Sequence, residues 1–302
     1  MFLKPQPLTT DKPIGDGRVI IIFEYDGQAF HGWQQQKSGV RSVQSELAKA
    51  VEKVADHPVE LVCAGRTDAG VHASFQVVHF DTTSVRTLRS WVMGINTALP
   101  DDIAVHWAGN GVDDFHARFS AIYRRYRYII LNDPVRPGIQ RGQVSWNFRP
   151  LDTDKMHRAA QALQGEHDFS SFRAAGCQSR TPIRFLEQIS VTRCGKYVVI
   201  DVQANAFLHH MVRNIAGALM AVGSGVQPVE WIAEVLEARN RKLAGVTAPP
   251  YGLYLVDVGY PAQFGMPEPL CGPGFVAPWF SEAANQPIPP THVHKKQPVT
   301  PS

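Results

Sequence analysis

The sequence predicts an α+β fold: two pseudo-duplicated halves with a mainly antiparallel sheet flanked by helices. Short β-branched and aromatic runs alternate with amphipathic helical patterns, the connections are short, and the mixture of strands and helices in the first half returns in the second. The chain has 302 residues, of which 44% are hydrophobic and 19% charged. It can therefore fill a substantial core, and it is not a wholly disordered polyelectrolyte.

The first half, residues 19–150, follows a leader at residues 1–18 that we expect to be flexible. A compact apolar run at 19–25 predicts a strand, and the Asp-Gly pair after it predicts a loop. From Val43 onward, apolar residues recur at helical spacing, and Ser42 is the expected N-cap. The other elements predicted in this half are strands at 60–64, 75–80, 103–107 and 123–131 and a helix at 87–99.

The second half, residues 151–260, is predicted to contain helices at 154–163, 208–222 and 229–238 and strands at 186–193, 197–204 and 253–258. Beyond it the composition changes, because the last 42 residues hold 10 of the 22 prolines. We expect an extended conformation over residues 261–302, with disorder from about residue 281.

Several function classes are excluded by what the sequence lacks. No run approaches the ~20 apolar residues of a membrane-spanning helix. Prolines and charges occupy the opening, where a secretory signal would be apolar. There is no P-loop and no dinucleotide fingerprint, and the four cysteines form no CxxC pair. We expect a cytoplasmic protein with reduced thiols and with no membrane contact, metal or cofactor; its cysteines are Cys63, Cys177, Cys194 and Cys271.

Basic residues concentrate between Arg118 and Arg149. This segment holds seven arginines and one acid, Asp133, so its net charge is +6 against +3 for the whole chain. Forked guanidinium groups suit phosphate, and the interleaved tyrosines add surface on which bases can stack. A solvated strand face covered by aliphatic stems would give the same pattern. The candidate RNA-binding residues are Arg118, Arg124, Arg125 and Arg127, interleaved with Tyr123, Tyr126 and Tyr128.

The segment AGRTDAGVHA, residues 64–73, contains the first candidate for a catalytic group. Glycines on both sides of Arg-Thr-Asp permit a sharp, exposed loop between strands, which can direct one carboxylate into a cleft. Asp68 is that candidate, with Arg66 and His72 as potential partners. The alternative is an aspartate that only stabilises a glycine-rich turn through its own backbone.

A second polar residue, Arg213, lies within the apolar helical segment LHHMVRNIAGALMAVG. A buried guanidinium needs a carboxylate or phosphate partner, because an unpaired buried charge is very costly. Arg213 would then face Asp68 and keep its carboxylate oriented and ionised; alternatively it extends to the surface. His209 and His210 are interpreted as residues at the helix start, and without a third ligand they do not make a metal site.

Other polar clusters are assigned to turns and strand ends rather than to a site. They comprise Asp113, Asp114, His116, His167 and Asp168.

Five motifs, in this order between about residues 20 and 260, resemble those of the TruA-type tRNA pseudouridine synthases. They are GRTDAGVHA, RFSAIYRRYRYII, GEHDFSSF, FLHHMVRNIAG and GLYLVDVGYP. The opening FEYDGQAFHGWQQQ is similar to that family's first strand and loop. Phe75 departs from the expected pattern, because the family is expected to place Gly before Gln76 and Val77. The departure concerns the local backbone near the loop.

The resemblance implies a pseudouridine-synthase-like fold and an isomerase that converts uridine to pseudouridine in the anticodon arm of tRNA, at positions 38 to 40, without a cofactor. It implies a homodimer with a shared RNA cleft. By the same resemblance, Asp68 is the essential aspartate, and Arg66 helps to displace or replace the flipped nucleotide. Tyr126 stacks on the target base and takes part in proton transfer, Arg213 pairs with the aspartate, and Leu253 forms the apolar wall of the base pocket.

The chemistry leaves two questions open. One carboxylate can attack the sugar or the base, or it can assist elimination at C2′; and the base that removes the C5 proton is either Tyr126 or Asp68. The alternatives from other classes are a non-catalytic RNA-binding protein or chaperone, which gains nothing from a carboxylate in its cleft, and a glycoside or nucleoside hydrolase. Such hydrolases generally use two acids, and the motif offers one.

Overall fold

The computed structural model describes residues 13–269 and 272–276. The strands of the first half are β1 (Pro13–Ile14), β2 (Gly17–Tyr25), β3 (Val62–Cys63), β4 (His72–Thr82), β5 (Arg86–Thr87), β6 (Ile103–Asn110), β7 (Tyr123–Asn132) and β8 (Ser145–Asn147). Those of the second half are β9 (Gly165–Asp168), β10 (Ile183–Cys194), β11 (Tyr197–Ala204) and β12 (Leu253–Gly259). The helices are α1 (Val43–Ala55), α2 (Leu88–Ala98), α3 (Thr153–Ala160), α4 (Met211–Gly223) and α5 (Trp231–Ala238).

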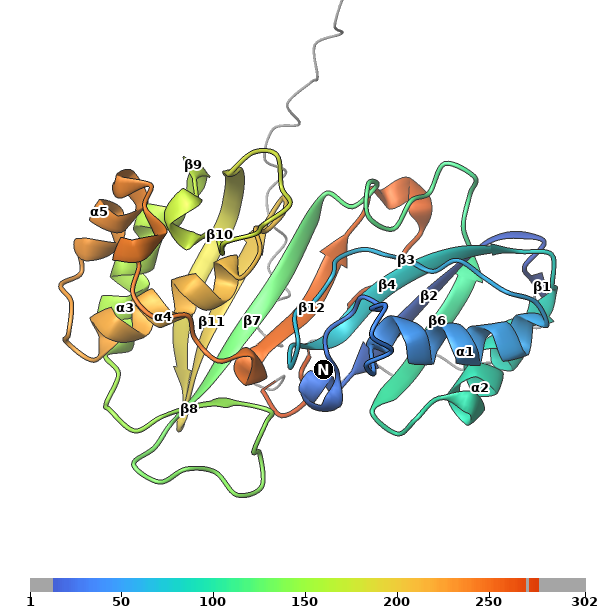
Figure 1. Cartoon of the computed structure of the whole chain (residues 1–302), viewed down its shortest axis with the longest axis horizontal. Helices are drawn as coiled ribbons and strands as arrows, with labels where there is room; N and C mark the ends of the chain where they lie inside the picture. Colours follow the sequence, from blue (N-terminus) through green and yellow to red (C-terminus); the bar gives the residue numbers. More distant parts are fainter. Residues whose placement is uncertain (1–12, 270–271, 277–302) are drawn as a thin grey trace, which may run out of the picture.

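One ten-stranded sheet runs through the described part of the chain, in the order β6-β2-β4-β12-β7-β11-β10-β9, with β3 beside β4 and β8 beside β7 (Figure 1). The β4–β12 and β7–β8 pairs are parallel, and the other neighbours are antiparallel. The predicted α+β class with a mainly antiparallel sheet is therefore confirmed.

The two halves are joined through the centre of this sheet. Strand β12, from the end of the second half, lies between β4 and β7 of the first half. In turn β7 pairs along its length with β11 of the second half. The boundary expected near residue 150 is therefore a boundary in sequence and not in the sheet, and the predicted pseudo-duplication remains a prediction.

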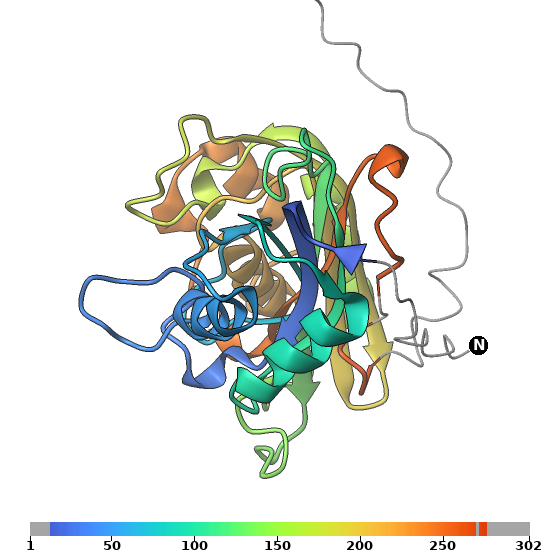
Figure 2. The same ribbon diagram turned by 90° about the vertical axis from the view of Figure 1, so that its right-hand side faces the viewer.

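Helices cover one face of the sheet, and Figures 1 and 2 show them on the same side. Alternate strand residues face opposite sides. Tyr128 and Ile130 of β7 belong to the large core under the helices, whereas Ile129 and Leu131 belong to a smaller cluster on the other face. That smaller cluster includes Val276, so the segment at residues 272–276 lies behind the sheet. The two faces of β7 thus have different surroundings, which decides where its arginines lie.

Most predicted elements are present, with corrected ends. Ser42 caps α1, where its Oγ accepts a hydrogen bond of 3.2 Å from the Ser45 N–H. Helix α4 begins three residues later than predicted, at Met211, because His210 has a left-handed backbone with φ of 60°. The strand predicted at 60–64 is reduced to β3, whereas the one predicted at 75–80 is longer. Against Glu24 of β2, strand β4 carries an extra residue at Ser74 and Phe75, so the backbone is irregular near the departure from the family pattern.

The expected flexible leader is wrong for residues 13–18, because β1 pairs with β5 and β2 begins at Gly17. The rest of that leader, Cys271 and the disorder expected from about residue 281 lie outside the described residues. None of the helices in the described ranges combines the length and apolar character needed to cross a lipid bilayer.

His79 of β4 links the stability of this fold to pH. Its side chain is 4% exposed, and its Nδ1 accepts a hydrogen bond of 3.1 Å from the Ala117 N–H. Burial, with smaller contributions from Arg18 and His116, lowers the pKa of His79 to about 4. Since the imidazole has a pKa near ~6.5 in an unfolded chain, the unfolded state binds the proton more readily. The contribution of neutral His79 to the free energy of unfolding is fully present above the unfolded-state pKa, and it is lost as the pH falls toward the folded-state pKa of about 4.

We expect the free energy of unfolding to be about 1–2 kcal/mol lower at a pH of about 5 than at neutral pH. Urea denaturation at both pH values measures the difference. His79→Gln, which keeps an acceptor but does not titrate, should lose less on acidification. An equal loss in the variant would assign the pH dependence to other groups.

Candidate active site

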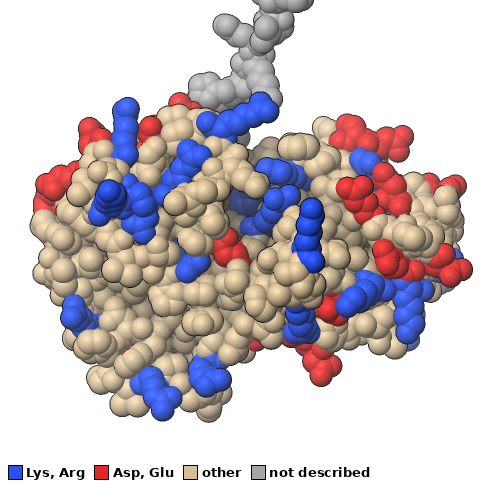
Figure 3. Space-filling view, viewed as in Figure 1, with Lys and Arg blue, Asp and Glu red and all other residues tan. Residues whose placement is uncertain are grey.

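The main cleft of the described structure opens on the helix-bearing face, between the two halves, and has a volume of about 1010 Å³. Figure 3 shows this face hollowed near its middle, with Lys and Arg side chains around the hollow. Four arginines line the cleft, against two acids, Glu60 and Asp68. The cleft therefore suits a polyanion.

The loop between β3 and β4 carries Asp68 into this cleft, and its backbone is firmly held. The Thr67 carbonyl accepts a 3.0 Å hydrogen bond from the Trp33 N–H, and the Asp68 carbonyl accepts one of 3.1 Å from the Val71 N–H. The Thr67 hydroxyl bonds the Tyr25 hydroxyl at 2.8 Å. Gly32, with φ of +87°, lies so close that a Cβ there would be 2.8 Å from the Thr67 oxygen. These contacts leave the Asp68 side chain free to face the cleft.

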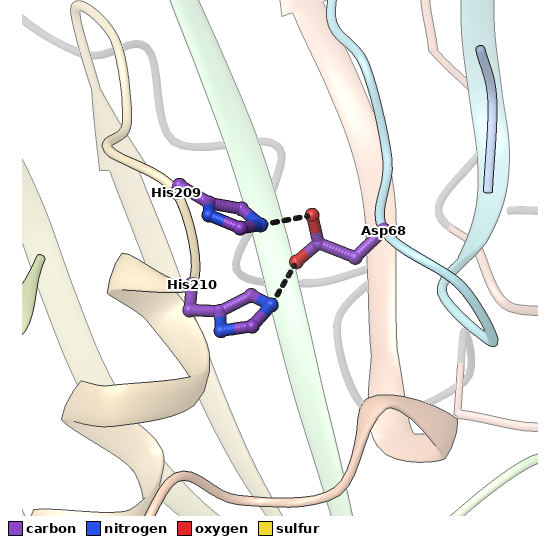
Figure 4. Close-up of side chains that lie close together, drawn as sticks. All are labelled: Asp68, His209 and His210. Carbon is purple, nitrogen blue, oxygen red and sulfur yellow. Dashed lines mark ion pairs between the residues drawn. The ribbon is translucent and has the colours of Figure 1, made fainter. Parts of the chain in front are cut away.

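Three cationic or imidazole groups from the other half surround the Asp68 carboxylate. Its Oδ1 lies 3.3 Å from Nε2 of His209, and its Oδ2 lies 3.4 Å from Nε2 of His210. Figure 4 shows both imidazoles turned toward the carboxylate. Nη1 of Arg213 lies 3.7 Å from Oδ2. The expected pairing of Arg213 with Asp68 is therefore present, although all three distances exceed those of close hydrogen bonds.

The start of α4 positions these groups. The left-handed turn at His210 precedes the helix, and Arg213 lies in its first turn, with its side chain 14% exposed. Nε of Arg213 donates to the Ala248 carbonyl at 2.9 Å, and the Ala248 N–H donates to the Arg213 carbonyl at 3.1 Å. At Gly217, one turn further, a Cβ would come within 1.9 Å of the Val246 oxygen. Only glycine therefore lets the 246–248 segment approach and hold Arg213.

The surroundings of His210 shift the pKa of its imidazole. Burial lowers the pKa of His210 below the ordinary value, and the Arg213 and His209 charges act in the same direction. The Asp68 carboxylate acts in the opposite direction and raises it. The net shift is downward, which favours the neutral form of the His210 imidazole.

Tyr126 and Leu253 form an apolar wall of the cleft, from the adjacent strands β7 and β12. Tyr126 is 8% exposed and packs edge-on against Phe207, with ring centroids 5.0 Å apart. Within the described residues, its hydroxyl has no hydrogen-bond partner. Burial raises the pKa of Tyr126 above the ordinary value, so the hydroxyl stays protonated and can donate to a ligand.

The arginines of the basic segment divide between the two faces of β7. Arg124 lines the cleft with Arg118 and Arg66, and its guanidinium donates to backbone carbonyls, including that of Ala64 at 2.9 Å. Arg118 and Arg66 are exposed. These three groups bring uncompensated positive charge to the cleft.

Arg125 and Arg127 face the other way, and neither lines the cleft. Nε of Arg125 lies 2.7 Å from Asp201 Oδ1, and Nε of Arg127 lies 2.8 Å from Asp201 Oδ2. Arg127 is 3% exposed and also donates to the Gly272 carbonyl at 2.9 Å. The placement of both side chains contradicts their selection as RNA contacts, because strand alternation directs them into a buried ion-pair cluster behind the sheet.

The other polar clusters support turns, as expected. Nδ1 of His116 accepts hydrogen bonds of 3.2 Å from the Arg118 and Phe119 N–H groups, and Asp168 Oδ1 accepts one of 2.8 Å from the Ser170 N–H.

A family model described as tRNA pseudouridine synthase matches residues 21–120 and 159–261. The chain belongs to the tRNA pseudouridine synthase family. The matched segments include Arg66, Asp68, Arg118, Arg213 and Leu253, whereas Tyr126 lies between them.

Individual members of the tRNA pseudouridine synthase family cover most of the chain. The tRNA pseudouridine synthase A of Shewanella amazonensis is 58% identical over 259 residues, which are 86% of this chain and 99% of that protein. The protein of the same name from Pseudomonas aeruginosa is 55% identical over 263 residues, 87% of this chain and 92% of that protein. A chain in the crystal structure of a Cbf5-Nop10-Gar1 complex aligns with a TM-score of 0.33 and 10% sequence identity. The alignment covers 80% of this chain and 57% of that chain, and the similarity is too distant to support an argument.

The family is one of isomerases that convert uridine to pseudouridine in tRNA, and the alternative of a non-catalytic RNA-binding protein has no support from these matches. Two features of the site were missed by sequence reasoning. His209 and His210 contact the carboxylate directly, and Phe119, 76% exposed, stands at the cleft. The residue type does not reveal that the backbone of His210 is left-handed. The exposure of Phe119 could have been expected, because it stands between polar residues in the run Arg-Phe-Ser before β7.

Proposed function

We propose that this protein isomerises uridine to pseudouridine at positions 38 to 40 of the tRNA anticodon arm, with Asp68 as the catalytic carboxylate and without a cofactor. The observation that carries the proposal is the meeting of Asp68 from one half with Arg213 from the other, in a cleft whose remaining charges are mainly positive. The motifs of the TruA-type family support the anticodon arm as the target. These motifs also support a homodimer. We further propose that the protein is cytoplasmic, which fits a tRNA substrate.

The reaction is an internal exchange of bonds. The bond between N1 and C1′ breaks, the uracil turns, and a bond forms between C5 and C1′. C5 then loses a proton and N1 gains one, so that the product is an isomer of uridine. Asp68 either attacks the sugar or the base, or takes a proton from C2′ during elimination; each route requires its carboxylate beside the nucleoside. Arg213 orients the carboxylate and balances its charge, and it is itself fixed by Ala248.

Tyr126 and Leu253 hold the uracil once it has left the base stack. Unstacking costs a few kcal/mol, and stacking on the Tyr126 ring offsets part of this cost. We infer that the Tyr126 hydroxyl, which lacks a protein partner in the described structure, exchanges a proton with the base. Either Tyr126 or Asp68 takes the C5 proton in the last step.

Arg66, Arg118 and Arg124 bind backbone phosphates, and the Phe119 ring offers a further stacking surface. We expect tRNA affinity to fall steeply with salt. Arg66→Gln and Arg118→Gln should each weaken binding and reduce the slope of log affinity against log salt by about 1. Equilibrium binding at several salt concentrations measures this slope. Arg89→Gln, an exposed arginine on α2, is the matched control and should leave it unchanged.

The test of the function is to map pseudouridine in tRNA from cells that lack this protein. We expect its loss at positions 38 to 40, restoration by the wild-type chain and no restoration by Asp68→Asn. Pseudouridine that persists at these positions would overturn the proposal. Release of free uracil from incubated tRNA would instead indicate a hydrolase, and restoration by Asp68→Asn would indicate a non-catalytic role.

A further inference from the structure

We propose that Asp68, His209 and His210 form a site for a zinc-class divalent cation in the RNA-free protein, and that the cation inhibits the enzyme. The two histidines alone do not make a site. The structure brings them to a carboxylate from the opposite half, so that a nitrogen of each ring and an oxygen of Asp68 all lie within 4.8 Å of one another.

The spacing of these atoms suits a tetrahedral metal. Zinc binds imidazole nitrogen and carboxylate oxygen at about 2.0–2.1 Å, and two ligands of a tetrahedron at that radius are about 3.3–3.4 Å apart. The separations between Asp68 and the two imidazoles are 3.3 Å and 3.4 Å. A direct hydrogen bond between the same atoms would be shorter. Each imidazole therefore already lies at the edge length of a coordination shell from one of the two carboxylate oxygens. Because the three donor atoms lie within 4.8 Å of one another, small side-chain rotations bring them around one cation.

The donor set selects the class of cation. Two imidazoles and one carboxylate suit zinc and its neighbours such as cobalt, whereas magnesium prefers a shell of oxygen atoms. The His209 and His210 side chains are 43% and 28% exposed, so a cation can enter from the cleft. Figure 4 shows the two rings side by side on the edge of the carboxylate. Water fills the remaining coordination positions.

Arg213 limits the affinity of this site. Its guanidinium lies 3.7 Å from Oδ2 of Asp68, where it repels a second cation and competes for the same oxygen. Binding is consequently reversible and weaker than at a structural zinc site. Removal of the Arg213 charge should strengthen zinc binding, whereas removal of either imidazole should weaken it. A general loss of folding would not produce these opposite signs.

The inhibition rests on the proposed function. A cation coordinated by Asp68 occupies the lone pairs with which this carboxylate would act on the nucleoside, and it fills space that the ribose needs. Zinc and tRNA therefore exclude each other at the carboxylate.

The test begins with zinc alone. Titration calorimetry of the metal-free full chain should give one zinc per chain in the micromolar range, and cobalt should give the intense visible absorption of a tetrahedral complex. Magnesium should give neither. His209→Ala and His210→Ala should each lower the zinc affinity at least about tenfold, since even the loss of a residue behind a ligand typically costs 10–100-fold. Arg213→Met should raise it.

Two matched controls lie in the same cleft. His31 is exposed there and does not belong to the cluster of Asp68, His209 and His210. Cys177 Sγ accepts a hydrogen bond from the His209 backbone N–H, at 3.4 Å. His31→Ala and Cys177→Ser should bind zinc as the wild type does. Zinc affinity that depends on Cys177, or that survives both imidazole substitutions, would overturn the proposed site.

Activity is measured separately. Wild-type pseudouridine formation should fall as zinc saturates the site and recover on chelation. Saturated enzyme with undiminished activity would overturn the inhibition. A chain that binds zinc as predicted but never forms pseudouridine would count against the proposed function and would leave the metal site standing.

Discussion

Asp68→Asn should abolish pseudouridine formation, with a fall in turnover of at least about 10³-fold. The amide keeps the shape of the side chain but can neither act as a nucleophile nor accept a proton as a carboxylate does. The release of tritium from C5 of labelled uridine in tRNA measures the loss. Folding should be nearly unchanged, because Asp68 is 27% exposed and its ion-pair distances of 3.3–3.7 Å indicate weak contacts.

Glu60→Gln provides the matched control for this prediction. Glu60 is the other acid that lines the cleft, and it is exposed. Its substitution should leave turnover close to that of the wild type, and tRNA binding should persist in both variants. Substantial turnover by Asp68→Asn would show that another group performs the chemistry.

Tyr126→Phe should reduce turnover by about 10²-fold or more, which is the usual contribution of a group that transfers a proton. The ring remains to stack on the base, and no protein hydrogen bond within the described residues is broken, so tRNA affinity and stability should change little. Tyr126→Ala should also weaken binding, because it removes the stacking surface. Single-turnover kinetics with tRNA in excess of its dissociation constant separate the two effects.

Tyr123→Phe is the control for loss of a hydroxyl from the same strand. The Tyr123 hydroxyl donates to Asp257 at 2.9 Å, away from the cleft. Its removal should lower stability and leave turnover nearly intact. Equal turnover for Tyr126→Phe and the wild type would remove Tyr126 from the proton-transfer steps and leave Asp68 as the remaining candidate.

The fold was largely predictable because its elements have strong local patterns. The periodicity from Val43 and the cap at Ser42 specify α1, and compact apolar runs specify β2 and β7. The position of β12 between β4 and β7 was not predictable, since it depends on contacts between residues about 180 positions apart in the chain, such as His72 and Tyr254. Local sequence carries no signal for such a pairing.

The candidate site was predictable where a residue broke a pattern. Arg213 interrupts an apolar helix, and the cost of an unpaired buried charge led to its pairing with Asp68. Two of the three arginines of β7 were wrongly selected as RNA contacts, because the selection used the charge of the segment and ignored that successive side chains of a strand face opposite sides of the sheet. Alternation by itself separates Arg124 from Arg125 and Arg127. The contact of His209 and His210 with Asp68 depends on the backbone of His210, with φ of 60°, which residue type does not reveal.

The central place of β12 bears on how the protein is made. A ribosome would deliver β4 and β7 well before this strand, and until it arrives both would present unpaired backbone edges that invite association with other chains. The same late strand brings Leu253 to the nucleoside pocket. The protein would thus become catalytically competent and protected from aggregation in one event near the end of synthesis. A nascent chain arrested before Leu253 should be both inactive and prone to self-association.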